Sequence, residues 1–226
     1  MKDIEHSSSP IAVTAIRESP RRPGRYWVEL SDKRRLLVTA GVLSDTGATR
    51  VGVVLSEEAL DRLAHEAVVI GLMDRALNLL ARSRRTRREL DLRLRRGEVE
   101  PGLIVEALDR LEAAGVLSDE EVARAEASAR LRRGEAPGRV RQQLLRKGVS
   151  GAVAREALAE ATRDDGFDEG AACRAAAEKR ARGLRGLELA VAERRLLGFL
   201  LRRGFSSSVA RVEVKRVLRG DGARYI

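Results

Sequence analysis

The sequence predicts a mainly α-helical protein, in which three tandem three-helix repeats follow a small β-rich N-terminal segment. A leucine, two basic residues and a glycine recur at a period of about 50 residues, which is typical of a repeat architecture: Leu94–Gly97, Leu145–Gly148 and Leu201–Gly204. Hydrophobic residues make up 43% of the 226 residues but aromatic residues only 3%, a composition that favours helix packing over a β-sandwich. Charged residues make up 35% and the net charge is +10. This charge indicates either an acidic partner or the solvated surface of an arginine-rich protein.

The first 55 residues are expected to hold a flexible leader over residues 1–10 and a small β-rich unit over residues 11–55. The leader is polar and ends at a proline. After it, short β-prone runs alternate with turn residues, which predicts a small antiparallel meander: Ile11–Ile16, Tyr26–Leu30 and Arg35–Val38. Tyr26 and Trp27 are two of the few aromatic residues, so we expect both to pack in the core of this unit. A platform on which bases stack is the alternative.

From residue 56 onward the apolar residues recur at helical spacing. Ser56 is a predicted N-cap, because Glu57 and Glu58 follow it and favour the start of a helix. We expect a linking helix and repeat 1 over residues 56–117, repeat 2 over residues 118–162, repeat 3 over residues 163–220 and a tail over residues 221–226.

In each repeat we expect one helix to end at the recurring glycine. At a helix C-terminus glycine adopts the left-handed conformation, and preceding cations face the negative end of the helix dipole. An apolar residue follows each glycine, and then the next helix begins. A further helix fits before the motif, since Ser118 and Glu121 form a capping-box pattern with Val116 placed for a hydrophobic staple.

The positive charge is concentrated in the middle helix of each repeat. Residues 82–96 hold eight basic and two acidic residues, whereas residues 137–148 and 194–203 each hold four basic residues and no acid. Basic pairs before a glycine also suit a helix end, but a merely solvated surface would spread the charge. We therefore expect a shared basic face that binds a partner or nucleic acid. The candidate binding residues are Arg84, Arg85, Arg87, Arg88, Arg95, Arg96, Arg139, Arg141, Arg146, Lys147, Arg194, Arg195, Arg202 and Arg203.

The sequence lacks the patterns that catalysis requires. It contains no Gly-Lys dipeptide, so it has no phosphate-binding Walker loop, and His6 and His65 are too few for a zinc site or a Ser-His pair. The acidic runs Asp119–Glu121 and Asp164–Asp165 are expected to begin helices rather than to bind metal. We therefore expect no enzyme activity, no catalytic residue, no metal and no cofactor.

Cys173 is the only cysteine, and we expect it to be a small core residue in a reducing compartment. No run approaches the ~20 apolar residues of a membrane helix, and the N-terminus lacks the apolar core of a signal peptide. We therefore expect a cytoplasmic protein that does not bind membranes.

Several segments follow one another in a characteristic order: Arg84–Leu90, Ala107–Leu111, Gly115–Glu121, Gly138–Val149 and Phe199–Ser206. Their order and spacing resemble the RecX family, the regulatory proteins of the RecA recombinase, from about residue 72 to residue 218. This sequence departs from the family at Val122, where members usually carry an aromatic residue, and by an extra residue around Glu98.

The resemblance implies an elongated, curved, basic molecule that lies in the groove of the RecA–DNA filament, inhibits the recombinase and modulates the SOS and DNA-repair response. The implied partners are the RecA filament and, with weaker and salt-sensitive binding, single- and double-stranded DNA. The protein is expected to be a monomer. Two other functions stay open: a free-standing helical DNA-binding protein or transcription regulator, and a scaffold for an acidic protein that involves no DNA.

Overall fold

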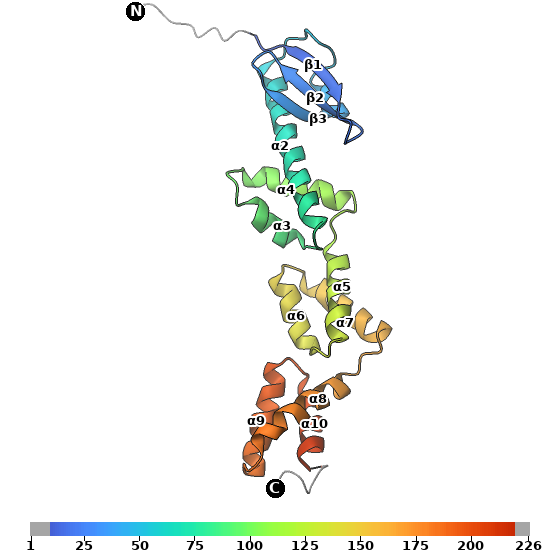
Figure 1. Ribbon diagram of the computed structural model, residues 1–226, viewed down its shortest axis with the longest axis vertical. Coiled ribbons are helices and arrows are strands. Elements are labelled where there is room, and N and C mark those ends of the chain that lie inside the picture. Colours follow the sequence, from blue (N-terminus) through green and yellow to red (C-terminus); the bar gives the residue numbers. More distant parts are fainter. Residues whose placement is uncertain (1–9, 220–226) are drawn as a thin grey trace, which may run out of the picture. The chain divides into compact units, whose positions relative to one another are not determined.

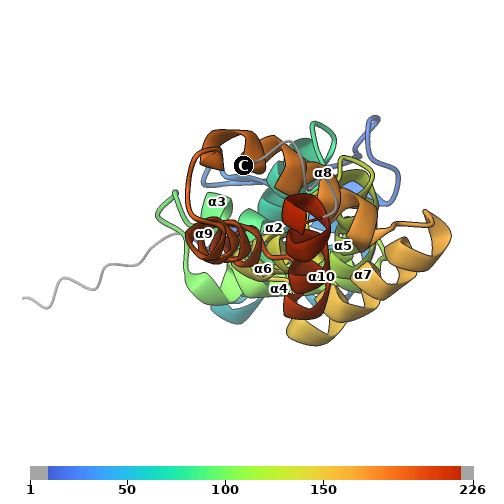
Figure 2. The same ribbon diagram turned by 90° about the horizontal axis from the view of Figure 1, so that it is seen from below.

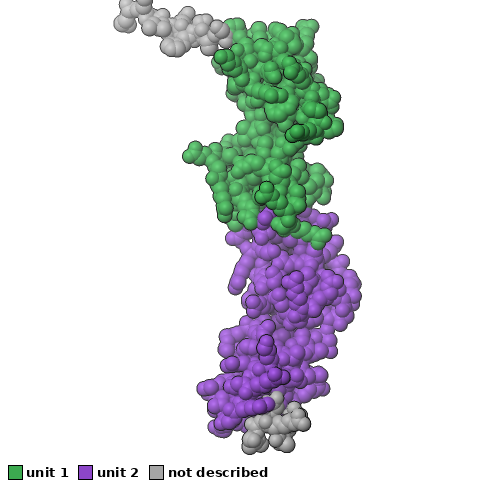
Figure 3. All heavy atoms as spheres, viewed as in Figure 1, with its two compact units in different colours: residues 1–84, 90–117 green, residues 85–89, 118–226 purple. Residues whose placement is uncertain are grey.

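The computed structural model describes residues 10–219 (Figure 1). Residues 1–9 of the expected leader and the expected tail at 221–226 lie outside the described part. The chain divides into two compact units, coloured separately in Figure 3. The first comprises the chain up to Arg84 together with Leu90–Leu117, and the second comprises Arg85–Glu89 together with the chain from Ser118 onward. No helix of residues 10–219 is both long enough and apolar enough to cross a membrane.

The first unit begins with a three-stranded antiparallel sheet, which confirms the predicted meander. Strands β1 (Val13–Glu18), β2 (Arg25–Leu30) and β3 (Arg35–Thr39) lie side by side in chain order. The turn between β2 and β3 contains Lys33 with a φ of 70°. A following short helix, α1 (Ala40–Asp45), contributes buried Leu43 to the core under the sheet.

The alternation of side chains along β2 decides where its aromatic residues point. Successive residues of a strand face opposite sides, so Tyr26 packs against the core with buried Val28 and Leu30. Trp27 points to the other face, where the guanidinium carbon of Arg35 lies 4.4 Å from the centroid of its ring. The expectation of a core aromatic is therefore confirmed for Tyr26 and wrong for Trp27.

Three helices complete the first unit: α2 (Glu57–Leu80), α3 (Arg87–Leu94), whose first residues belong to the second unit, and α4 (Pro101–Ala113). The Ser56 hydroxyl accepts a hydrogen bond from the backbone nitrogen of Ala59 at 3.2 Å, which confirms the predicted N-cap. The apolar faces of the three helices share one core, and its fully buried large side chains include Leu90, Leu94, Ile104, Leu108 and Leu111.

The second unit contains two further three-helix repeats. One consists of α5 (Asp119–Leu131), α6 (Pro137–Arg146) and α7 (Gly151–Asp164). The other consists of α8 (Glu169–Ala181), α9 (Leu189–Arg202) and α10 (Ser207–Arg219), with a short 3₁₀ helix at Arg182–Leu184. Helix α10 packs against both α8 and α9 (Figures 1 and 2). Each repeat has its own core, so the mainly α fold of three three-helix repeats is confirmed.

The helix ends test three local predictions, which concern Ser118, Val116 and the pair Asp164–Asp165. Ser118 caps α5 as expected, since its hydroxyl accepts a hydrogen bond from the backbone nitrogen of Glu121 at 3.1 Å. Val116 is 49% exposed, so it does not form the expected staple. Asp164 and Asp165 lie at the end of α7, not at the start of a helix, because α7 continues to Asp164 before the chain turns. There the carboxylate of Asp165 accepts a hydrogen bond from the Ser128 hydroxyl at 2.6 Å.

The buried leucines correct the predicted alignment of the repeats. Leu94 is buried, but Leu145 and Leu201 are 38% and 42% exposed, and Leu144 and Leu200 take the buried position instead. Gly97 therefore follows its buried leucine by three positions, whereas Gly148 and Gly204 follow theirs by four. In this alignment Val99, Val149 and Phe205 are equivalent buried or partly buried positions without a gap between the repeats.

Candidate partner- and nucleic-acid-binding surface

The glycine of the third repeat holds two helices together. Gly204 adopts a left-handed φ of 90°, and the backbone nitrogen of Phe205 reaches back to the carbonyl oxygen of Leu200 at 3.2 Å. The carbonyl oxygen of Gly204 accepts a hydrogen bond from the backbone nitrogen of Gly138 at 3.0 Å, so the end of α9 touches the start of α6. A Cβ on Gly138 would lie 2.5 Å from that oxygen. Both glycines are thus required by close backbone approach.

The glycine of the second repeat has the same role. Gly148 has a φ of 93°, and a Cβ there would lie 2.5 Å from the Cβ of Arg88. Beside it the hydroxyl of Thr86, which is fully buried, donates a hydrogen bond to the carbonyl oxygen of Lys147 at 2.6 Å. Gly97 is absent from the left-handed residues among those described. The expected glycine cap is therefore confirmed for the second and third repeats and wrong for the first.

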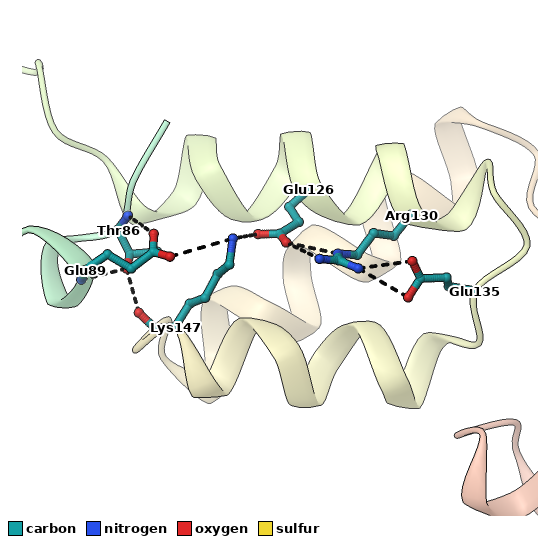
Figure 4. A network of polar contacts seen from close by, with 6 residues as sticks. All are labelled: Thr86, Glu89, Glu126, Arg130, Glu135 and Lys147. Atoms are coloured by element: carbon teal, nitrogen blue, oxygen red, sulfur yellow. Dashed lines mark hydrogen bonds and ion pairs between the residues drawn. The ribbon is translucent and has the colours of Figure 1, made fainter. Parts of the chain in front are cut away.

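One of the predicted binding residues, Lys147, lies in a network of charges inside repeat 2 (Figure 4). Its Nζ atom lies 2.7 Å from a carboxylate oxygen of Glu126, and Arg130 Nη2 lies 2.8 Å from the other oxygen. Arg130 also bonds Glu135 at 3.0 Å. Burial raises the pKa of Glu126, but the hydrogen bonds and charges of Lys147 and Arg130 outweigh it, so the pKa lies below its ordinary value. The charge of Lys147 is thus largely compensated within the repeat.

Several other predicted binding residues also have partners. The Arg95 guanidinium bonds Asp91 at 2.7 Å, which raises the pKa of Arg95. Arg139 lies 3.7 Å from Glu135 with its side chain 54% exposed. Arg87 is held through its backbone nitrogen, which donates to a carboxylate oxygen of Asp119 at 2.8 Å.

Two predicted binding residues, Arg203 and Arg85, are half-buried and have different environments. The guanidinium carbons of Arg203 and Arg180 each lie 5.6 Å from the ring centroid of Phe199, a distance at which cations attract an aromatic face. Arg85 is half-buried, and its buried Nε atom has no hydrogen-bond partner in the described part of the chain.

The remaining predicted residues are exposed and lie more than 4.0 Å from every carboxylate of the described residues: Arg84, Arg88, Arg96, Arg141, Arg146, Arg194, Arg195 and Arg202. One position recurs among them. Counted from the buried Leu94, Leu144 and Leu200, the second following residue is an exposed arginine in all three repeats: Arg96, Arg146 and Arg202. The recurrence of charge is therefore limited to one arginine of each repeat.

Arg75 is a further cation of this surface that was not among the predicted binding residues. Arg75 lies on α2, whose spacing of apolar residues indicates only a core-forming helix. A Cβ on Gly97 would lie 3.6 Å from Arg75 Nη1, so the guanidinium of Arg75 lies next to the basic pair of the first repeat. No sequence pattern indicates this contact, because it joins two different helices.

These features define a protein built of tandem three-helix repeats. Each repeat presents, at or just after the end of its middle helix, an arginine that has no carboxylate partner among the described residues. The three-helix domain models of RecX match this chain in order: the first at residues 73–111, the second at residues 118–158 and the third at residues 168–211.

Proteins of the same family are similar over much of the chain. The regulatory protein RecX of Chlorobaculum tepidum is 33% identical over 153 residues, which cover 67% of this chain and 91% of its own. That of Halorhodospira halophila is 38% identical over 91 residues, and the match spans 40% of this chain and 56% of its own. A crystal structure of a regulatory protein RecX has the same fold, with a TM-score of 0.72 and 24% identity over 88% of this chain and 96% of its own. The chain belongs to the RecX family.

Proposed function

We propose that this protein binds the groove of a RecA–DNA filament through the arginines of its repeats and lowers the activity of the recombinase. Through RecA it modulates the SOS and DNA-repair response. Its partners are the RecA filament and, with weaker and salt-sensitive binding, single- and double-stranded DNA. It acts as a monomer and without catalytic chemistry of its own.

The recurrence of Arg96, Arg146 and Arg202 is the observation that carries this proposal. A cation without a carboxylate partner is free to meet an external anion, and it occurs once per repeat at an equivalent position. A helical filament presents the same surface at regular intervals, so linked repeats can bind several protomers at once. Each contact can then be weak, because linkage raises the effective concentration of the next one. The phosphates of filament-bound DNA supply anions that make such binding sensitive to salt.

Three binding measurements test the proposal: to bare single-stranded DNA, to bare duplex and to RecA-coated single-stranded DNA, all at the same low salt concentration. We expect the tightest binding to the coated strand and a lower RecA ATPase rate at substoichiometric protein. Tight, sequence-dependent binding to bare duplex would identify a free-standing DNA-binding regulator instead. Equal binding to RecA with and without DNA would identify a scaffold for an acidic protein surface.

A further inference from the structure

The first unit contains a pocket that is lined by four arginines and, among the described residues, by no carboxylate. The pocket has a volume of about 360 Å³ and lies between the C-terminal part of α2 and the end of α3. Arg75, Arg82, Arg93 and Arg96 line it, with Asn78 as a further polar group. Two leucines supply its only apolar walls, and no aromatic ring is present.

The charge of this arginine pocket is not compensated inside the unit. None of the four guanidinium groups lies within 4.0 Å of a carboxylate of the described residues. The Nε atom of Arg93 is buried and has no hydrogen-bond partner among residues 10–219, so packing rather than a counter-charge holds this side chain. Like charges at close range destabilise one another, and an unpaired buried donor is costly. A bound anion would relieve both.

Repeat 2 has a carboxylate on its first helix where repeat 1 has one of the pocket arginines. Ala76 of α2 and Ala127 of α5 are both fully buried alanines of the first helix of their repeat, and the residue before each differs in charge. In repeat 2 it is Glu126, which bonds Lys147 and Arg130 (Figure 4). In repeat 1 it is Arg75. The first repeat therefore has a cation where the second has the carboxylate that fills its own basic site.

We propose that the arginine pocket binds the phosphodiester backbone of a nucleic-acid strand. A guanidinium offers a planar fork of donors that fits phosphate oxygens, and four of them exceed the single charge of one phosphodiester. The pocket therefore takes consecutive phosphates of a strand. Because no aromatic ring lines it, it does not stack bases, and binding is independent of sequence. This assignment rests on the proposed function in taking DNA as a partner, but it requires no recombinase.

Charge reversal at Arg75 tests the pocket. The full-length chain is titrated against a fluorescent abasic deoxyribose-phosphate strand, which offers backbone and no bases, and anisotropy is followed at several salt concentrations. Arg75→Glu places in repeat 1 the carboxylate that repeat 2 has, so we expect an unchanged or raised Tm and at least tenfold weaker binding. The slope of log affinity against log salt should flatten by about 1–2 units, from ~0.7 for each lost phosphate of a single strand. Arg75→Lys should keep part of the affinity.

Arg50→Glu is the matched control, since Arg50 is an exposed arginine of the same unit outside the pocket. Its affinity should stay within about threefold of wild type, because long-range repulsion from one exposed charge is screened. Equal losses in the two variants would overturn the proposal. If Arg75→Glu lowers the Tm, Arg82→Gln tests the same pocket at an exposed residue just beyond the end of α2. An unchanged affinity of Arg82→Gln for the abasic strand would then overturn the proposal.

Two results separate this site from its alternatives. The wild-type chain could be stabilised by ATP but fail to bind the abasic strand. If Arg75→Glu also abolished this stabilisation, the ligand of the pocket would be a free nucleotide, and the nucleic-acid assignment would be overturned. A chain that binds the abasic strand through Arg75 but leaves RecA activity unchanged would refute the proposed function while confirming the pocket.

Discussion

Replacing Glu126 by Gln removes the charge that holds two cations inside repeat 2. The Glu126 side chain is 14% exposed, whereas those of Lys147 and Arg130 are 32% and 25% exposed. A hydrogen bond between charged groups contributes about 1.5–3 kcal/mol when buried, but an exposed ion pair contributes only about 0–1 kcal/mol. Since both cations are partly exposed, we expect Glu126→Gln to lower the local unfolding free energy by about 1–3 kcal/mol at pH 7.

The unfolding free energy that Glu126→Gln removes should be smaller at low pH. The folded-state pKa of Glu126 is lower than its ordinary value, because Lys147 and Arg130 outweigh the effect of burial. The stabilisation is therefore complete above the unfolded-state pKa of about 4.3 and is lost as the pH falls through the lower folded-state pKa. Native-state amide hydrogen exchange in α5 and α6 of the full chain, at pH 7 and near pH 3, measures both values.

Glu160→Gln is the control for this prediction. Glu160 pairs with Arg124 at 2.8 Å, but the side chains are 36% and 53% exposed, so its loss should stay below about 1 kcal/mol. Two results would refute the view that Glu126 neutralises Lys147 and Arg130 in repeat 2. One is a loss of unfolding free energy in Glu126→Gln that is equal at both pH values, and the other is a loss equal to that of Glu160→Gln.

Two other predictions concern packing. Gly204→Ala should lower the unfolding free energy by more than about 2 kcal/mol, because its positive φ and its contact with α6 both exclude a side chain. Gly134 has a φ of 74° and open space around it, so Gly134→Ala should lower the unfolding free energy by only about 1 kcal/mol. Equal losses of unfolding free energy in the two variants, measured by chemical denaturation, would argue against a tight contact between α6 and α9. Cys173 is fully buried, and burial raises the pKa of its thiol to about 11. A thiol reagent at pH 8 should therefore modify Cys173 only at the rate at which its repeat opens, and immediate modification of the native chain would contradict this.

The fold was predictable because helix-forming patterns act locally. The N-caps at Ser56 and Ser118 follow from residues within a few positions of one another. The alignment of the first repeat failed because it relied on glycine. Gly148 and Gly204 each lie against the start of another helix, whereas Gly97 lies against a flexible arginine, so its position is less constrained.

The candidate surface was less predictable, since its charges are sorted by contacts between helices. Lys147 and Arg146 are neighbours in the sequence, yet only Lys147 turns toward Glu126, which lies on another helix. The contribution of Arg75 was hidden for the same reason. Counting charges along the chain finds the basic helices, but it does not separate the compensated cations from the free ones.

The most direct test of the account is the binding of one triple variant to RecA-coated single-stranded DNA. Replacing Arg96, Arg146 and Arg202 by Gln removes from every repeat the recurring arginine that has no carboxylate partner within residues 10–219, and it keeps helix propensity. The control replaces Arg50, Arg155 and Arg211 by Gln. These arginines are also exposed and have no carboxylate partner among the described residues, but they lie outside the basic helices.

Affinity for the coated strand is measured from low to physiological salt, with the Tm of each variant as a check of folding. We expect the first variant to bind at least tenfold more weakly at low salt, with a salt slope flatter by up to about 2–3 units, and the control to bind like the wild type. Wild-type affinity and an intact salt slope in the Arg96, Arg146 and Arg202 variant would contradict the central claim that these arginines bind the filament.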